Sequence, residues 1–191
     1  MKSENFETIA VRTQAERSGF REHSAPIYMT SSFMFEDAEQ ARALFADEIE
    51  GNIYSRFSNP NTTEFIQKIC KLEGAEDGIA TASGMSAIFT SMMPFLSSGD
   101  HIIVSRSVFG STHQIVTQIL PRWGIEYTYV DILDTAGWEK AFRKNTKMVF
   151  VETPSNPALD MIDLAWLSGL CKSHNVLLNV DNCFATPYLQ K

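Results

Sequence analysis

The chain has 191 residues, of which 44% are hydrophobic and 20% are charged, a composition typical of a soluble globular domain. Its formal net charge of −7 argues against a nucleic-acid or anionic-membrane partner, because both need a basic face. No apolar stretch approaches the roughly 20 residues of a membrane span, and the charged N-terminal segment lacks the apolar core of a signal peptide. These features favour a cytoplasmic protein.

The cysteines and histidines indicate neither a disulfide framework nor a metal site. The three cysteines (Cys70, Cys171 and Cys183) are odd in number and far apart, so no CxxC site is formed. The four histidines show no metal-ligand spacing such as HExxH. We therefore expect no bound metal and a reducing compartment.

Residues 1–59 predict an irregular arm rather than a compact domain. A helix is expected near 5–16 and another within 36–48, separated by an extended stretch. The pattern changes at residue 60, so residues 60–191 are expected to form a second domain.

That second region alternates short apolar runs with amphipathic stretches. Asn59 as an N-cap, Pro60 in the first turn and Gly74 at the end predict its first helix. Strands are predicted at 78–82, 101–105, 125–131, 148–152 and 176–181, with helices at 84–96, 110–122, 134–143 and 163–174. The alternation indicates an α/β fold, with a mostly parallel sheet covered by helices on both faces. Ligands of such sheets bind beyond the carboxyl ends of the strands.

A small-residue turn follows the first of these predicted strands. Ser83, Gly84 and Met85 open a helix, where free backbone N–H groups can bind phosphate and glycine permits close approach. The alternative is a tight strand–helix turn capped by Ser83. The fingerprints GxGxxG and GxxxxGK[ST] are both absent, which weighs against NAD and nucleoside triphosphates.

Four further residues lie at predicted strand ends. Phe109 is either an ordinary core aromatic or a ring that stacks on a planar ligand. Asn156, in a turn bounded by two prolines after Glu152, either holds that turn or points an amide into the crevice. Asp181 either caps the following turn or pairs with a cationic ligand. Together with the helix start, the set fits a flat, phosphorylated, nitrogen-containing ring such as pyridoxal 5′-phosphate (PLP).

The sequence also resembles a known enzyme family. The matching stretches are "PIYMTSSFMF", "YSRFSNPNT", "EGAEDGIATASGMSAI", "GDHIIVS", "VFVETPSNP" and "VDNCFATPYLQ", in the family's order over essentially the whole chain. They are similar to the PLP-dependent enzymes of cysteine and methionine metabolism, which include cystathionine γ-synthase, cystathionine and methionine γ-lyases, and homoserine-ester sulfhydrylases. The resemblance is greatest to the O-succinylhomoserine sulfhydrylase branch, and it implies the large domain of the aminotransferase-like, type I fold.

The resemblance implies how the cofactor phosphate is held. Gly84 and Met85, next to Ser83, should offer backbone amides to it. Tyr54 and Arg56 should bind it from the neighbouring subunit, the arginine as a bidentate guanidinium. Residues 1–59 would then serve the partner's site in a homo-oligomer, and tetramers built as dimers of dimers are common in the family.

It also implies how the ring is held. Asp181 should keep the pyridine nitrogen protonated, so that the ring can withdraw electrons from the substrate. Asn156 should bond near the ring oxygen, with Glu152 close by in a supporting role. Two positions depart from the family pattern: Phe109 replaces a frequent tyrosine, which favours the sulfhydrylase branch, and Cys183 replaces a frequent threonine.

The resemblance further implies that the catalytic Schiff-base lysine lies in an S-x-x-K segment after the strand that ends at Asp181. None of the lysines of this chain has that context, so we expect an N-terminal portion of the enzyme without its C-terminal domain. The implied reaction converts O-succinylhomoserine and sulfide into homocysteine in methionine biosynthesis. Cystathionine γ-synthase and the γ-lyases remain alternatives, as does a non-catalytic, truncated subunit.

Overall fold

The computed structural model of the chain describes residues 5–13 and 17–191, and it contains two compact units. One unit runs to Ala80 and includes Lys191, and the other comprises residues 81–190. The predicted helix near 5–16 is α1 (Phe6–Arg12), and residues 14–16 lie outside the described part of the chain. The boundary predicted between residues 59 and 60 from the change of sequence pattern stays a prediction.

The N-terminal unit also contains α2 (Ala38–Phe45) and α3 (Pro60–Glu73). The start and end of α3 confirm the sequence signals. The Asn59 side chain accepts a hydrogen bond from the Asn61 amide at 3.0 Å, and Pro60 is the first helical residue. Gly74 ends the helix with a φ of 73°, a left-handed conformation that costs glycine little.

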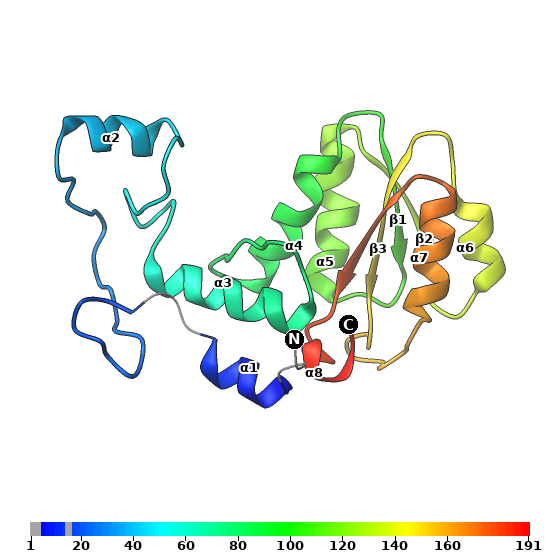
Figure 1. Ribbon diagram of the computed structural model, residues 1–191. Helices are drawn as coiled ribbons and strands as arrows, with labels where there is room; N and C mark the ends of the chain where they lie inside the picture. Colours follow the sequence, from blue (N-terminus) through cyan, green and yellow to red (C-terminus); the bar gives the residue numbers. More distant parts are fainter. Residues whose placement is uncertain (1–4, 14–16) are drawn as a thin grey trace. The chain divides into compact units, whose positions relative to one another are not determined.

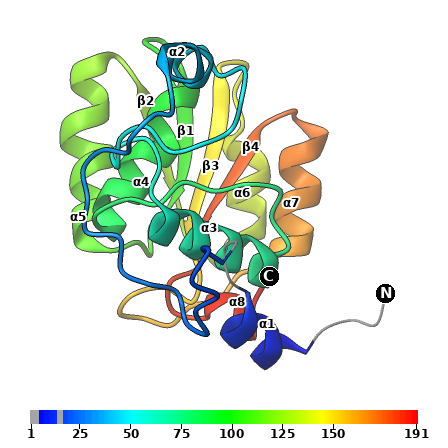
Figure 2. The same ribbon diagram turned by 60° about the vertical axis from the view of Figure 1, so that its left-hand side comes forward.

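The C-terminal unit is built on a parallel four-stranded sheet. Its strands are β1 (His101–Ser105), β2 (Glu126–Val130), β3 (Thr146–Glu152) and β4 (Leu177–Asp181). Their spatial order is β2-β1-β3-β4, as Figure 2 shows, and every pair is parallel. The predicted fold class is therefore confirmed.

Helices cover both faces of this sheet (Figure 1). They are α4 (Gly84–Met92), α5 (Gly110–Gln114), α6 (Thr135–Ala141) and α7 (Leu164–Ser173). Short helical segments extend this set: η1 (Met93–Phe95) after α4, the π-helical η2 (Ile115–Ile119) and η3 (Leu120–Trp123) after α5, and α8 (Thr186–Leu189) after β4. In the described part of the chain, no helix is long and apolar enough to cross a membrane.

The alternation of side chains along the central strands creates two hydrophobic cores. On β3, Phe150 packs with residues of α4 and of the helical stretch that begins with α5. Val149 and Val151 pack on the opposite face with Trp138 of α6 and Leu167 of α7. Both faces of β1 are buried, and so are both faces of β3 from Met148 to Glu152, as their continuous apolar runs predict.

Two strand predictions need correction. Residues 78–82 form no strand, and the side chain of Ile79 is 82% exposed. A strand needs a hydrogen-bonded neighbour, and none of the described strands pairs with this segment. The strand that ends at Asp181 is half-buried rather than buried, because β4 lies at one edge of the described sheet.

A buried histidine lies near the amino ends of the strands. His101 on β1 is fully buried, with Nδ1 2.8 Å from the Thr146 hydroxyl and Nε2 2.8 Å from the Thr128 hydroxyl. Burial and the nearby positive charge of Arg143 lower the pKa of His101 from 6.5 to about 4, although the Glu126 carboxylate acts in the opposite direction.

This lowered pKa predicts a loss of stability in mild acid. As the pH falls below 6.5 toward 4, the unfolded chain takes up a proton that folded His101 does not, so the free energy of unfolding falls. Urea unfolding at pH 7 and pH 5 is expected to show a loss of about 2 kcal/mol from this group. A His101→Asn variant should lose that part of the pH dependence, whereas His174→Asn, at an exposed position, should keep it.

Candidate functional site

The order of the strands indicates where a ligand would bind. The chain passes from β1 to β2 on one side, and then to β3 on the other side of β1. Parallel sheets bind ligands beyond the carboxyl ends of their strands, at the point where the strand order reverses. That point lies between β1 and β3, and we call the strand ends on this side the carboxyl edge.

Helix α4 begins with unpaired backbone amides. The Ser83 hydroxyl accepts a hydrogen bond from the Ser86 amide at 3.2 Å, so Ser83 is the helix cap. The amides of Gly84 and Met85 have no acceptor among the described residues. A Cβ atom placed on Gly84 would meet nothing within 4 Å, so space is open beside this backbone. The helix start can therefore accept an anionic group.

Glu152 connects two loops at the switch point. Its Oε2 accepts a hydrogen bond from the Phe109 amide at 2.7 Å, and its Oε1 accepts one from the Asn156 amide at 3.0 Å. Phe109 precedes α5 and its side chain is 44% exposed, so it is not a core aromatic. Burial raises the pKa of Glu152, and the negative charge of Asp181 also raises it, while the two amide bonds lower it.

Asp181 ends β4 directly beside Glu152, its register partner on β3. Its Oδ1 accepts a hydrogen bond from the Cys183 amide at 3.0 Å, so it does stabilise the following turn. A hydrogen bond to Asp181, followed by burial and the charges of Asp181 and Glu152, raises the pKa of the Cys183 thiol to about 11. Cys183 is therefore protonated at neutral pH and a poor nucleophile.

A second link joins the same two loops, and no sequence motif indicated it. The Ser107 hydroxyl donates to Asp160 Oδ2 at 3.1 Å, and the Asp160 amide donates to the Ser155 hydroxyl at 3.0 Å. Serine and aspartate are common in loops, so only the rule that parallel strand ends meet at one edge could have suggested this pairing.

Tyr54 and Arg56 lie in the N-terminal unit, so we describe their contacts within that unit alone. Tyr54 forms an isolated antiparallel bridge with Ser32. The Arg56 guanidinium lies 5.4 Å from the ring centres of both Tyr54 and Phe57, and Arg56 is exposed. Among the described residues, no carboxylate forms a salt bridge with Arg56. Its charge is therefore available to an anion.

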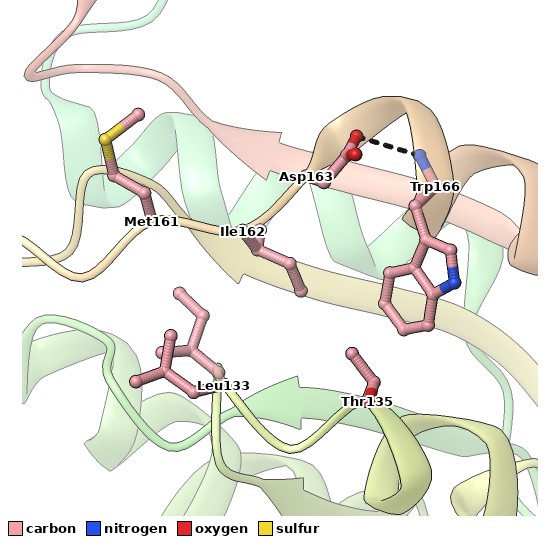
Figure 3. Close-up of a pocket in the computed structure, with 7 residues that line it drawn as sticks. Leu133, Thr135, Met161, Ile162, Asp163 and Trp166 are labelled. Atoms are coloured by element: carbon pink, nitrogen blue, oxygen red, sulfur yellow. Dashed lines mark hydrogen bonds between the residues drawn. The ribbon is translucent and has the colours of Figure 1, made fainter.

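A separate hollow of about 310 Å³ lies between the starts of α6 and α7 (Figure 3). It is lined by Ile132, Leu133, Thr135, Met161, Ile162, Asp163 and Trp166. The carboxylate of Asp163, which lines the hollow, already caps α7, since its Oδ1 accepts a hydrogen bond from the Trp166 amide at 3.0 Å. None of the site residues predicted from the sequence lines this hollow.

The residues at the carboxyl edge fit PLP. The helix start offers amides for a phosphate, Phe109 offers a flat apolar face, and the adjacent carboxylates of Glu152 and Asp181 favour a cation. No group of three or more histidine, cysteine, aspartate or glutamate side chains in the described ranges could hold a metal ion.

The sequence model of the family described as "Cys/Met metabolism PLP-dependent enzyme" matches residues 7–191. The chain belongs to this family. PLP is the family's cofactor, and the resemblance read from the sequence motifs is confirmed.

Relatives within the Cys/Met metabolism family include more than one type of enzyme. The chain is 48% identical, over 186 residues, to an O-succinylhomoserine sulfhydrylase of Pseudomonas aeruginosa, covering 97% of this chain and 46% of the relative. It is 41% identical to an L-methionine gamma-lyase of Fusobacterium nucleatum, covering 100% of this chain and 49% of the relative. The chain thus spans about half the length of the curated relatives that it matches.

Solved structures of this family show the same fold. A putative O-acetylhomoserine (thiol)-lyase of Campylobacter jejuni, solved with N′-pyridoxyl-lysine-5′-monophosphate, superposes with a TM-score of 0.91 at 36% identity. The match covers 96% of this chain and 45% of that one. The fold is therefore that of PLP-dependent enzymes.

Proposed function

We propose that the protein carrying this chain is a sulfhydrylase that uses O-succinylhomoserine and sulfide. In this reaction the Cγ–O bond of the ester breaks, succinate leaves, and the sulfur of sulfide bonds to Cγ to give homocysteine. When bound, PLP would supply an electron sink for the negative charge that remains on carbon after protons are removed next to the reacting centre. This chain contributes the carboxyl edge that would bind and orient the cofactor.

The phosphate and one face of the ring are bound by groups near the starts of α4 and α5. The Gly84 and Met85 amides donate to the phosphate, because no acceptor among the described residues uses them. Ser83 holds the turn through its cap to Ser86. The half-exposed ring of Phe109 stacks on the cofactor ring.

Polar groups at the ends of β3 and β4 would hold the polar atoms of the cofactor ring. Asp181 holds a proton at the pyridine nitrogen, and the side-chain amide of Asn156 donates to the ring oxygen. The register pairing of Glu152 with Asp181 places two carboxylates together, and a protonated ring nitrogen offsets the repulsion between them.

Tyr54 and Arg56 complete the phosphate site of a second copy of the chain in a homo-oligomer. Two observations support this role. Arg56 is exposed and has no carboxylate partner in the described residues. The N-terminal unit also exposes large apolar side chains, including Phe20, Met29 and Met34, each above 90%, as surfaces that meet a partner often do.

The sulfhydrylase reaction is favoured over its alternatives by the 48% identity to an O-succinylhomoserine sulfhydrylase. Phe109 supports the same choice, because it stacks on a ring but lacks a hydroxyl that could move a proton during elimination. A γ-lyase is the second candidate, since methionine gamma-lyases match at 41% identity.

Product analysis separates these candidates. The purified protein, supplied with PLP and O-succinylhomoserine, is expected to release homocysteine with sulfide and to release little ketobutyrate when no thiol is added. Chromatography of the products with sulfide, with cysteine and with neither provides the measurement. Cystathionine formed from cysteine at a comparable rate would favour a γ-synthase, and rapid ketobutyrate formation without thiol would favour a γ-lyase.

A protein that binds PLP but forms none of these products would instead be a non-catalytic subunit. A dialysis measurement of PLP binding, made on the same preparation, distinguishes this outcome from a protein that has lost its fold.

A further inference from the structure

The buried side chain of Glu152 lies where the loop after β1 meets the loop after β3. The residue is 6% exposed, and its two oxygens accept hydrogen bonds from two different loops. Phe109 belongs to the loop between β1 and α5, and Asn156 belongs to the loop between β3 and α7. We call this pair of hydrogen bonds the Glu152 bridge.

A carboxyl group of this length satisfies both amides. A carboxylate accepts at each oxygen, whereas a glutamine amide accepts at one end and donates at the other. With glutamine, one backbone N–H would face a donor and lose its partner, which is costly in a buried place. An aspartate would keep the charge but would be one methylene too short to reach both loops.

The two residues held by the bridge are the ones proposed to contact the cofactor ring. Phe109 provides the stacking face, and Asn156 provides the amide for the ring oxygen. Hydrogen bonds of 2.7 and 3.0 Å join the backbone amides of both residues to Glu152, which ends the central strand β3. The bond between Ser107 and Asp160 joins the same loops at a second point.

We propose that Glu152 is a positioning residue, which sets the spacing between the Phe109 ring and the Asn156 amide through their backbones. This inference rests on the proposed function, because that function assigns the two residues to the cofactor. It specifies the supporting role that the resemblance implied for Glu152, since the carboxylate acts through the polypeptide rather than by binding the cofactor.

Hydrogen exchange tests the bridge without cofactor. In a Glu152→Gln variant, the Phe109 or Asn156 amide is expected to exchange about ten- to a hundred-fold faster than in the wild type, because a bond to a charged acceptor is lost. Mass spectrometry of peptides covering 106–112 and 153–160 provides the measurement. The control is Glu126→Gln, which removes the same charge at an exposed position and should leave both peptides unchanged.

PLP affinity, measured by equilibrium dialysis on the same variants, supplies the second readout. Loss of the bridge should weaken binding about ten-fold, since a displaced ring face and amide no longer match the ligand. Weaker PLP binding with unchanged exchange would overturn the inference and make Glu152 a direct ligand. If exchange is faster in Glu152→Gln but the wild-type protein does not bind PLP, the hydrogen bonds of the bridge are supported and the proposed function is refuted instead.

A global loss of structure is recognised by faster exchange in β1 itself. The Glu152→Asp variant then replaces Glu152→Gln, because it keeps the charge while breaking at least one bond of the bridge. If exchange in β1 also rises in this variant, Glu152 stabilises the whole sheet, and the local positioning role is wrong.

Discussion

Replacing Asp181 by asparagine is expected to lower the rate of homocysteine formation by about a hundred-fold or more. Asparagine keeps the shape and can still accept the hydrogen bond that the Cys183 amide donates at 3.0 Å. It removes the negative charge, however, which in the proposed function stabilises a protonated pyridine nitrogen by several kcal/mol in a partly buried place. The loss of about 2.7 kcal/mol would correspond to a hundred-fold change in rate.

The measurement is steady-state turnover with saturating PLP, so that weaker cofactor binding does not limit the rate. Asp163→Asn is the matched control, because asparagine caps a helix as well as aspartate and the residue lies at the start of α7. Turnover of the control should equal that of the wild type. Turnover of Asp181→Asn within three-fold of the wild type would show that Asp181 only stabilises its turn.

Mixed oligomers are expected to recover activity from two inactive variants. In the proposed assembly, the site of one copy uses its own Asp181 together with Arg56 of a second copy. A dimer that combines Arg56→Ala with Asp181→Asn then contains one site with both defects and one site with neither. Random pairing should restore about a quarter of the wild-type turnover, because half of the dimers are mixed and half of their sites are intact.

The control mixture combines Asp181→Asn with Asn156→Ala. Both residues belong to the C-terminal unit, so each site of a mixed dimer carries the defect of its own copy. Co-production of the two variants, followed by turnover measurements on the purified oligomer, provides the test. No recovery in the first mixture, with both variants still assembling, would show that Arg56 does not act on a second copy.

Much of the fold could be predicted because its signals are local. The cap at Asn59 and the left-handed glycine at Gly74 define the ends of α3 in the sequence and in the structure alike. The continuous apolar runs of β1 and β3 predicted strands covered on both faces, and each packs against two layers of helices.

The strand predicted at 78–82 was wrong for a reason that composition cannot reveal. Its apolar and β-branched residues suit a strand, but strand formation depends on a neighbouring backbone. None of the described strands lies beside it in the hydrogen-bonded order. The half-burial of β4 has the same origin, since it depends on which strands are present at the edge of the sheet.

The candidate site was predicted residue by residue but not as an arrangement. The sequence placed Phe109, Glu152 and Asp181 at strand ends, where a parallel sheet binds its ligands. It could not show that Glu152 would join the backbones of two loops, because Phe109 and Asn156 are separated from each other by 47 positions in the chain.

The sequence by itself determined the alternation of strands and helices, the capped helix starts and the kinds of side chain available to a phosphorylated ring. Periodicity and capping act over a few residues, so they can be recognised in a linear chain. Only the tertiary structure decided the order β2-β1-β3-β4, the place of the switch point and the Glu152 bridge. These depend on contacts between distant residues, which arise when the chain buries both faces of the sheet.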